Sequence, residues 1–349
     1  MPWVKAILSE VYGFKGIVDT GAFRLIVIDG STIQQPGATE TTYRLHIAMD
    51  LVAMRIIQVH ISTEKTGESL DLYNLQEGDV VIVDRGYNSP KALVPFLSSG
   101  KEVILRYNPH SMSLYEFDSN WCRHKIQWKE KLESLGGKSG HFKVYLCYEQ
   151  QRIEVTLHAI RLSEEDAQKA RRNVRRRAKK RGKAPSAEAL VLCDWVFVLS
   201  SLPVTILSTT NVGALYRVRW QVELLIKRMK SILGIDKLRA FKDSPLSDLY
   251  LHGKLLWISV VEKITCQRFE QAKRRMDQVG REVTDWRLWE SVQQTLKACL
   301  TDCFTFRAEF VQDMIKSVKE RPRKRTLQSL PSRVVELIEW CRGQGMSLV

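Results

Sequence analysis

The run VVIVDRGY, residues 80–87, is a continuous apolar stretch that ends on Asp84. A strand that is apolar on both of its alternating faces is buried on both sides, as in an α/β sheet. The run FRLIVIDG, residues 23–30, has the same character and ends on Asp29 and Gly30. We therefore predict two buried strands, each followed by an acidic residue at its end.

The neighbouring segments complete a sheet domain around these two strands. YRLHIAMD and RIIQVHIS follow the first strand across short links, which indicates an antiparallel meander. SPKALVPFLSSG predicts a helix, and KEVILRYN predicts a fifth strand. We expect an α/β fold class: a mixed five-stranded sheet with helices packed on it.

The sheet pattern breaks at Asn108 and returns with WVFVLSSLP at residues 195–203. The intervening chain is polar and strand-like and includes a basic segment, so we expect a β-rich insertion into the sheet domain. After Gly234 the sequence is mostly helical in pattern. The predicted divisions are 1–22, a short N-terminal remainder; 23–107, the first part of the core; 108–190, the insertion; 191–245, the second part of the core; and 246–349, a helical C-terminal region.

The composition predicts a folded protein of a reducing, cytoplasmic compartment. Hydrophobic residues make up 44% of the 349 residues, which excludes a disordered chain. No apolar run is long enough for a membrane span or a signal peptide. The seven cysteines are odd in number and scattered, as expected for free thiols.

Positive charge is concentrated in short tracts. Residues 163–183 hold ten Lys and Arg against three acids, and residues 316–325 hold six against one. Residues 227–242 hold six against Asp236 alone, within a chain of formal net charge +15. Such tracts favour a polyanion, and nucleic acid in particular, as the partner.

The segment YRVRWQVELLIKRMK, residues 216–230, predicts one amphipathic helix. At about 100° per residue, four polar side chains lie on one narrow stripe beside an apolar, core-facing surface. They are Tyr216, Arg219, Glu223 and Lys230. Taken alone, this stripe is more typical of a solvated salt-bridge ladder on an amphipathic helix than of a catalytic site.

Three carboxylates indicate a catalytic metal site. Asp29 and Asp84 end predicted strands, where ligand crevices form in such sheets, and Glu223 lies on the helix that follows the last strand. An oxygen-rich set of this kind suits two Mg²⁺ or Mn²⁺ ions and the chemistry of phosphoryl transfer. The alternative is that the two aspartates only cap turns.

The motifs IVIDGS, IVDRGY and Y-x₂-R-x₃-E-x₆-K resemble those of the DDE transposases of bacterial insertion sequences that carry the YREK signature. This is the family named for insertion sequence four. The resemblance covers about residues 23–245 and implies a ribonuclease H-like fold with a β-rich insertion between Asp84 and Glu223. Relatives usually carry a substantial helical DNA-binding region before the first Asp, whereas 28 residues precede Asp29 here. This difference predicts that most of that region is missing from the chain.

The resemblance also implies roles for individual residues. Asp29, Asp84 and Glu223 are expected to be the catalytic metal ligands, and Tyr216, Arg219 and Lys230 to hold phosphates of the transposon end. Trp195 lies at a position similar to one where some members stack a flipped base, although a buried strand aromatic is the competing interpretation. In the basic segment we expect DNA-backbone contacts from Arg175, Arg176 and Arg177.

The predicted function is therefore metal-dependent DNA cleavage at insertion-sequence ends, followed by strand transfer into target DNA. The alternatives are a ribonuclease H-like nuclease without joining activity and an inactive, truncated DNA-binding remnant. The expected partners are transposon-end and target DNA and a second copy of the chain in a homodimer on DNA, with no membrane partner and no small-molecule cofactor. The expected location is the bacterial cytoplasm, with association to the nucleoid when the protein is bound to DNA.

Overall fold

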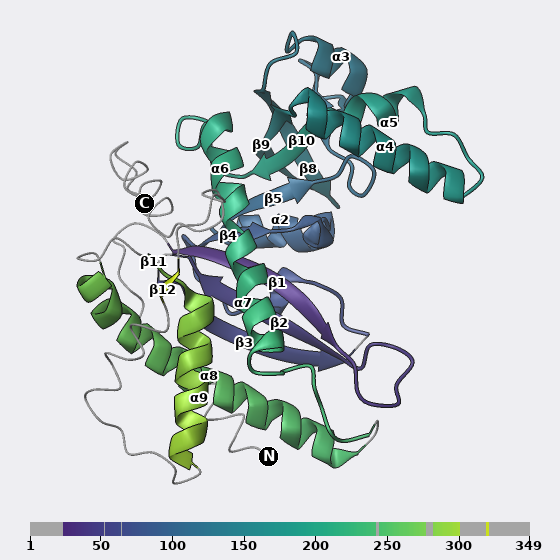
Figure 1. The fold of residues 1–349 in the computed structure, drawn as a ribbon. Coiled ribbons are helices and arrows are strands. Elements are labelled where there is room, and N and C mark those ends of the chain that lie inside the picture. Colours follow the sequence, from purple (N-terminus) through teal and green to yellow (C-terminus); the bar gives the residue numbers. More distant parts are fainter. Residues whose placement is uncertain are drawn as a thin grey trace. The chain divides into compact units, whose positions relative to one another are not determined.

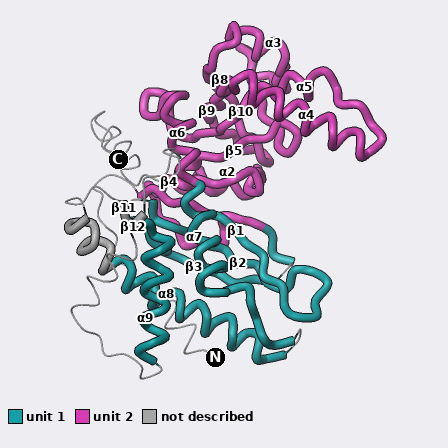
Figure 2. Tube along the Cα trace, in the orientation of Figure 1, with its two compact units in different colours: residues 1–18, 29–67, 220–330 teal, residues 19–28, 68–219, 331–349 magenta. Residues whose placement is uncertain are grey.

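The computed structural model describes residues 24–51, 53–63, 65–241, 244–276, 282–300 and 319–320. These residues form two compact units, shown in Figure 2. Unit 1 contains the described residues of 29–67, 220–300 and 319–320. Unit 2 contains residues 24–28 and 68–219. The predicted segment 1–22 and the tail beyond residue 320 lie outside the described residues.

Unit 2 is built on a mixed sheet whose strands follow the order β1-β4-β5-β10-β9-β8-β6-β7 (Figure 1). The strand β1 pairs in parallel with β4, and β4 pairs in parallel with β5, while β10 is antiparallel to both of its neighbours. The strands are β1 (Leu25–Ile33), β4 (Val80–Val83), β5 (Glu102–Tyr107), β6 (Tyr115–Phe117), β7 (Arg123–Lys125), β8 (Gly140–Tyr148), β9 (Gln151–Arg161) and β10 (Trp195–Ser200).

Both buried strands were predicted from their continuous apolar runs, which leave no face for solvent, but the predicted end of the first strand at Asp29 and Gly30 is wrong, because β1 continues to Ile33. All four residues of β4 and the first four of β1 are buried. The helices of unit 2 are η1 (Leu70–Leu72), η2 (Arg85–Tyr87), α2 (Pro90–Ser98), α3 (Trp128–Glu133), α4 (Glu164–Lys180), α5 (Ala187–Leu192) and α6 (Thr209–Val218).

Unit 1 contains the strand order β3-β2-β1, to which β1 contributes its second half. The strands β2 (Tyr43–Asp50) and β3 (Arg55–Thr63) are antiparallel, as predicted, and a register shift falls between Ala48 and Met49. The remaining elements are α7 (Trp220–Ser231), α8 (Pro245–Met276), β11 (Glu282–Val283), α9 (Asp285–Leu300) and β12 (Lys319–Glu320). The order β3-β2-β1-β4-β5 confirms the predicted mixed, ribonuclease H-like α/β class.

The sheet is larger than the five strands predicted. The strand β9 pairs with β10 over six residue pairs, from Trp195 opposite Arg161 to Ser200 opposite Thr156. The hairpin β8–β9 and then β6 and β7 continue outward from β9. Strands of the expected insertion therefore extend the core sheet, because the edge of β10 offers backbone donors and acceptors that β9 satisfies.

The single helix predicted for residues 216–230 is wrong. The helix α6 ends at Val218, Arg219 is its C-cap, and α7 begins at Trp220. The backbone N–H of Arg219 donates to the Tyr216 carbonyl at 3.1 Å, a bond three residues back that tightens the last turn. Tyr216 and Arg219 consequently belong to unit 2, and Glu223 belongs to unit 1.

None of the described helices combines the length and the apolar character that a bilayer crossing requires. His46 on β2 and His158 on β9 are fully buried. The described cysteines carry free thiols: Cys122, Cys147, Cys193, Cys266 and Cys299.

A buried ion pair closes the edge of unit 2 where β1 and β4 begin. Arg24 Nε donates to Asp79 Oδ1 at 2.7 Å, and Nη2 donates to Oδ2 at 2.5 Å. The Asp79 carboxylate also accepts from the backbone N–H of Gln76 at 2.7 Å. Replacing Asp79 by Ala leaves the guanidinium of Arg24 without this partner, so we predict a loss of about 3–5 kcal/mol in the free energy of unfolding.

Urea denaturation measures this loss. The control is Lys129→Ala, which removes a solvent-exposed pair with Glu133 at 4.0 Å and is expected to change stability by less than about 1 kcal/mol. Equal effects of the two substitutions would contradict the role given to Asp79.

Burial of His158 predicts a pH dependence of stability. Its Nδ1 lies 3.0 Å from Thr209 Oγ1. Desolvation, and then the nearby His141, lower the pKa of His158 from 6.5 to about 4. The folded state therefore binds a proton less readily than the unfolded chain, and the contribution of His158 is complete above pH 6.5 and is lost as the pH falls toward 4. We expect about 3 kcal/mol of such loss, measured by denaturation at pH 7 and pH 4, and a smaller loss in His158→Gln. An identical pH dependence in the two proteins would exclude His158 as its cause.

Candidate active site in two half-sites

Unit 1 brings together the elements that carry Asp29 and Glu223. Asp29 is half-buried on β1, where its Oδ1 accepts from the backbone N–H of Gly30 at 2.8 Å. Glu223 is half-buried in the first turn of α7. In the last turn of α7, Lys230 Nζ donates to the carbonyl of Thr32 on β1 at 3.1 Å. This bond ties the helix that carries Glu223 to the strand that carries Asp29.

The apolar face predicted for this helix lies in the core. Four side chains of α7 that were expected to face inward are buried: Val222, Leu225, Ile226 and Met229. Their burial fixes the rotation of α7, so that Glu223 lies at the border between the buried face and solvent.

Unit 2 brings together Asp84, Tyr216 and Arg219. Asp84 directly follows β4 and occupies the N-cap position of η2. The hydroxyl of Tyr216 donates to Asp84 Oδ1 at 3.2 Å, and the guanidinium of Arg219 lies 5.7 Å from the centre of the Tyr216 ring. We expected Tyr216 to hold a phosphate, whereas the structure places its hydroxyl on a predicted metal ligand.

The environment of Tyr216 keeps its hydroxyl protonated. Burial is the main cause that raises the pKa of Tyr216 to about 12, the carboxylate of Asp84 adds to the increase, and the guanidinium of Arg219 opposes it. The phenol therefore remains a donor throughout the neutral and mildly basic range, which holds one oxygen of Asp84 in a defined direction.

Gly86, the glycine of the IVDRGY motif, lies close to a neighbouring side chain. A Cβ atom at Gly86 would overlap the carboxylate of Glu68, which packs against the backbone just after Asp84. Any larger residue would require Glu68 to move. The carboxylate is the far end of a flexible side chain, so a small residue at this position is accommodated once Glu68 moves aside.

The predicted ligands are thus described as two half-sites: Asp29 with Glu223 in unit 1, and Asp84 with Tyr216 in unit 2. Within the described part of the chain, no group of three or more His, Cys, Asp or Glu residues is placed to hold a metal ion. The donor chemistry nevertheless fits a hard divalent cation, because both half-sites present half-buried carboxylates: Asp29 within β1, Glu223 in the first turn of α7, and Asp84 directly after β4.

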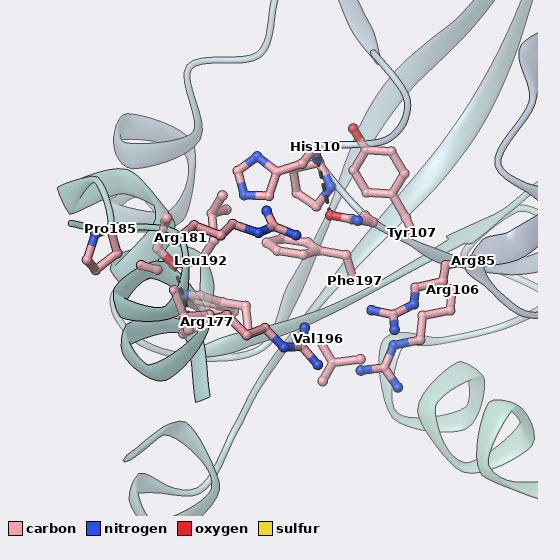
Figure 3. A pocket seen from close by; sticks show the side chains of 17 residues that line it. Arg85, Arg106, Tyr107, His110, Arg177, Arg181, Pro185, Leu192, Val196 and Phe197 are labelled. Atoms are coloured by element: carbon pink, nitrogen blue, oxygen red, sulfur yellow. Dashed lines mark hydrogen bonds between the residues drawn. The ribbon is translucent and has the colours of Figure 1, made fainter. Parts of the chain in front are cut away.

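Unit 2 also contains a cationic cavity of about 530 Å³ that Trp195 and Arg177 both line. Trp195 opens β10, is 7% exposed, and has the guanidinium of Arg161 at 5.1 Å from its ring centre. This burial agrees with the packing interpretation of Trp195, and base stacking stays a prediction. Figure 3 shows the arginine side chains around the cavity.

Four arginines line the cavity: Arg85, Arg106, Arg177 and Arg181. Its 17 lining residues also include His110 and contain no Asp or Glu. Sequence reasoning missed Arg85 and Arg106. Arg85 directly follows Asp84 in the IVDRGY motif, and this position beside a predicted metal ligand could have identified it.

The basic segment forms α4, and the charges at its two ends suit the helix dipole. Ser163 Oγ accepts from the backbone N–H of Asp166 at 3.2 Å, and acidic residues fill the first turn while basic residues fill the last. Arg171 is used internally, since its Nη2 lies 2.8 Å from Glu164 and its Nε lies 3.3 Å from Asp194. The three arginines predicted to contact DNA are exposed on this helix: Arg175, Arg176 and Arg177.

Comparison with known proteins identifies the family. A sequence profile described as "Transposase DDE domain" matches residues 20–244. The "Putative transposase InsL for insertion sequence element IS186A" of Escherichia coli (strain K12) is 27% identical over 272 residues, which cover 75% of this chain and 72% of that protein. The "Transposase for insertion sequence element IS421" of Escherichia coli has the same identity and coverage.

More distant similarities are also found. The "Transposase for insertion sequence element IS231F" of Bacillus thuringiensis subsp. israelensis is 22% identical over 67% of this chain and 55% of its own length. A solved structure of the piggyBac transposase synaptic complex with hairpin DNA aligns with a TM-score of 0.39 and 11% identity, over 89% of this chain and 61% of that chain. Because the family profile spans most of the sequence, including all three predicted carboxylates, this chain belongs to the Transposase DDE domain family.

Proposed function

We propose that this protein uses Asp29, Asp84 and Glu223 as one metal site to cut DNA at insertion-sequence ends and to join the cut end to target DNA. The observation that carries the proposal is the bond from Tyr216 to Asp84, in which one signature residue orients a carboxylate that another motif supplies. Membership of the transposase family supports the DNA substrate.

The strand register supports a common site for the two aspartates. Val27 on β1 is paired with Ile82 on the parallel strand β4. Asp29 lies two residues after Val27, and Asp84 lies two residues after Ile82. Since paired parallel strands advance together, the two carboxylates are expected at the same edge of the sheet.

Glu223 would complete the ligand set from α7. Two Mg²⁺ or Mn²⁺ ions bound by the three carboxylates would supply charge stabilisation for both the attacking and the leaving oxygen of a phosphoryl transfer. Tyr216 would keep Asp84 oriented, so that less of the ligand geometry has to be organised when DNA arrives.

The cations next to the half-sites would hold the DNA. Arg219, which lies beside Tyr216, offers a fork for two phosphate oxygens. Lys230 would exchange the Thr32 carbonyl for a phosphate oxygen, which is a charged and stronger acceptor. The exposed arginines of α4 would contact the DNA backbone, and Trp195 with the cationic cavity would receive a nucleotide of the transposon end.

We further propose that a homodimer acts on two DNA ends. Because both the cleavage and the joining step require an end held in place, two copies would bring two ends to one target. Sedimentation of the protein with and without a DNA end tests this arrangement.

Substitution of the three carboxylates tests the metal site. Asp29→Asn, Asp84→Asn and Glu223→Gln are expected to reduce Mg²⁺-dependent cleavage of a DNA end by at least about 10³-fold, because neutral amides cannot replace the charge that holds the cations. DNA binding in EDTA is expected to remain within a few-fold of the wild type. Cleavage and binding are measured on the same labelled DNA end.

The matched control is Glu133→Gln, which changes an exposed carboxylate of α3. Near-normal cleavage by any one of the three site variants would remove that residue from the proposal. A strand-transfer assay with a pre-cut end separates a transposase from a nuclease, which gives no joined product. DNA binding without any metal-dependent cutting in the wild type would instead indicate an inactive remnant.

Tyr216→Phe tests the orienting hydrogen bond. Loss of the hydroxyl leaves Asp84 in place without its donor, so we expect the metal concentration for half-maximal cleavage to rise by about 10- to 100-fold. A metal titration of the cleavage rate gives this value, with thermal melting to confirm the fold. An unchanged metal requirement would show that the bond to Asp84 has no role in the reaction.

A further inference from the structure

The hairpin β6–β7 in unit 2 presents an exposed tryptophan in an unfavourable backbone conformation. Trp121 has φ of 58° and is 58% exposed. A bulky residue in the left-handed region is uncommon, and glycine or asparagine is usual there. The indole therefore occupies a strained position in which most of its surface remains in water.

The loop around Trp121 is held by its own hydrogen bonds. Asp118 Oδ1 accepts from the backbone N–H groups of Asn120 and Cys122, both at 2.9 Å. Asp118 Oδ2 lies 2.9 Å from His124 Nε2, and the backbone N–H of Trp121 donates to the Asp118 carbonyl at 3.0 Å. These bonds define the conformation of the loop, and they keep Trp121 at the surface.

The Trp121 ring is part of a stack of aromatic and guanidinium groups. The guanidinium of Arg152 on β9 lies 4.1 Å from the ring centre of Trp121 and 5.4 Å from that of Phe117. The Phe117 and Trp121 rings are 6.1 Å apart, and Phe117 meets Tyr145 edge-on at 5.0 Å. Arg152 and Phe117 thus stiffen the indole from the side of the protein.

The surface next to this stack is cationic. All three residues of β7 are exposed, and they are Arg123, His124 and Lys125. The guanidinium of Arg123 lies 4.7 Å from the ring centre of Tyr115. Arg123 and Lys125 share the strand face of Phe117 and Tyr115, and Arg152 is exposed as well, so the hairpin combines aromatic rings with several cationic groups.

We propose that Trp121 and Arg152 form a stacking site for an unpaired base of DNA, with Arg123 and Lys125 of β7 contacting the adjacent phosphates. Aromatic faces flanked by cations are how proteins bind single strands without reading sequence. The site lies on the hairpin and uses none of the residues of the half-sites or of the cationic cavity. It rests on the proposed function only in taking DNA as the partner.

Two observations favour DNA over a protein partner. Arg123 and Lys125 of β7 are exposed cations, which suits a polyanion. The short loop holds Trp121 in a strained backbone conformation while most of the indole remains exposed, so burial within this chain does not offset the strain. Such strain is expected of a residue whose contact is made with a ligand.

The test is fluorescence anisotropy of a labelled oligothymidylate, in EDTA so that no cleavage occurs. Trp121→Ala is expected to weaken binding by about tenfold or more, and Arg152→Ala is expected to weaken it as well. With an abasic oligonucleotide of the same length, wild type and Trp121→Ala are expected to bind alike. The control Tyr250→Ala removes a ring that is 41% exposed and lies in unit 1, outside the basic tracts, and its affinity is expected to equal that of the wild type.

A second variant separates loss of the ring from misfolding of the loop. Trp121→Gly removes the ring and takes the positive φ without strain, so it is expected to melt no lower than Trp121→Ala while binding equally weakly. Unchanged binding of oligothymidylate by both variants would overturn the proposal, as would an equal loss with intact and abasic strands. Loss of dimerisation in Trp121→Ala with unchanged DNA binding would overturn it in favour of a protein contact.

Because binding is measured without metal, its outcome is independent of cleavage. A base-dependent loss in Trp121→Ala would stand even if the carboxylate variants still cut DNA. Conversely, normal binding by Trp121→Ala would leave the proposed metal site untouched.

Discussion

The parallel pairing of β1 with β4 is the constraint on which the candidate site depends. Three consecutive pairs, from Leu25 opposite Val80 to Val27 opposite Ile82, set the two strands in register. Both strands are buried on both faces here, so a slip in register would replace the close packing of every one of these side chains. That register sets the positions of Asp29 on β1 and of Asp84 directly after β4. The bidentate ion pair of Arg24 with Asp79 lies where the two strands begin.

The signature residues divide into two functions around the helix break. On α6, Tyr216 donates to Asp84 and is accompanied by Arg219. On α7, Lys230 is bonded to β1 and the buried face sets the direction of Glu223. The four signature residues, which lie on one stripe of the predicted helix, are therefore divided between two units: Tyr216 and Arg219 in unit 2, and Glu223 and Lys230 in unit 1. We interpret this division as the reason why the spacing of the four residues is part of the motif.

Much of this arrangement was predictable from local pattern. Continuous apolar runs identified the strand that contains Asp29 and the strand that Asp84 follows, and the helical period identified the buried face of α7. The end of α6 at Val218 was not predictable, because the residues around Arg219 are good helix formers and only a backbone bond to Tyr216 marks the break. The bond between Tyr216 and Asp84 joins residues 132 positions apart, and neither the apolar pattern nor the spacing of polar residues encodes such a contact. The extension of the sheet by β9 was missed because edge pairing depends on backbone groups, which every sequence carries.

The central claim is that Asp84 and Glu223, from two different units, bind the same catalytic cations. The most direct measurement is the metal specificity of cleavage in Asp84→Cys and Glu223→Cys, since a thiolate ligand disfavours Mg²⁺ and accepts softer ions. The account predicts that both variants are inactive with Mg²⁺ and regain cleavage of a DNA end with Mn²⁺ or Cd²⁺, whereas the wild type cuts with Mg²⁺. Undiminished Mg²⁺-dependent cleavage by either cysteine variant would contradict it.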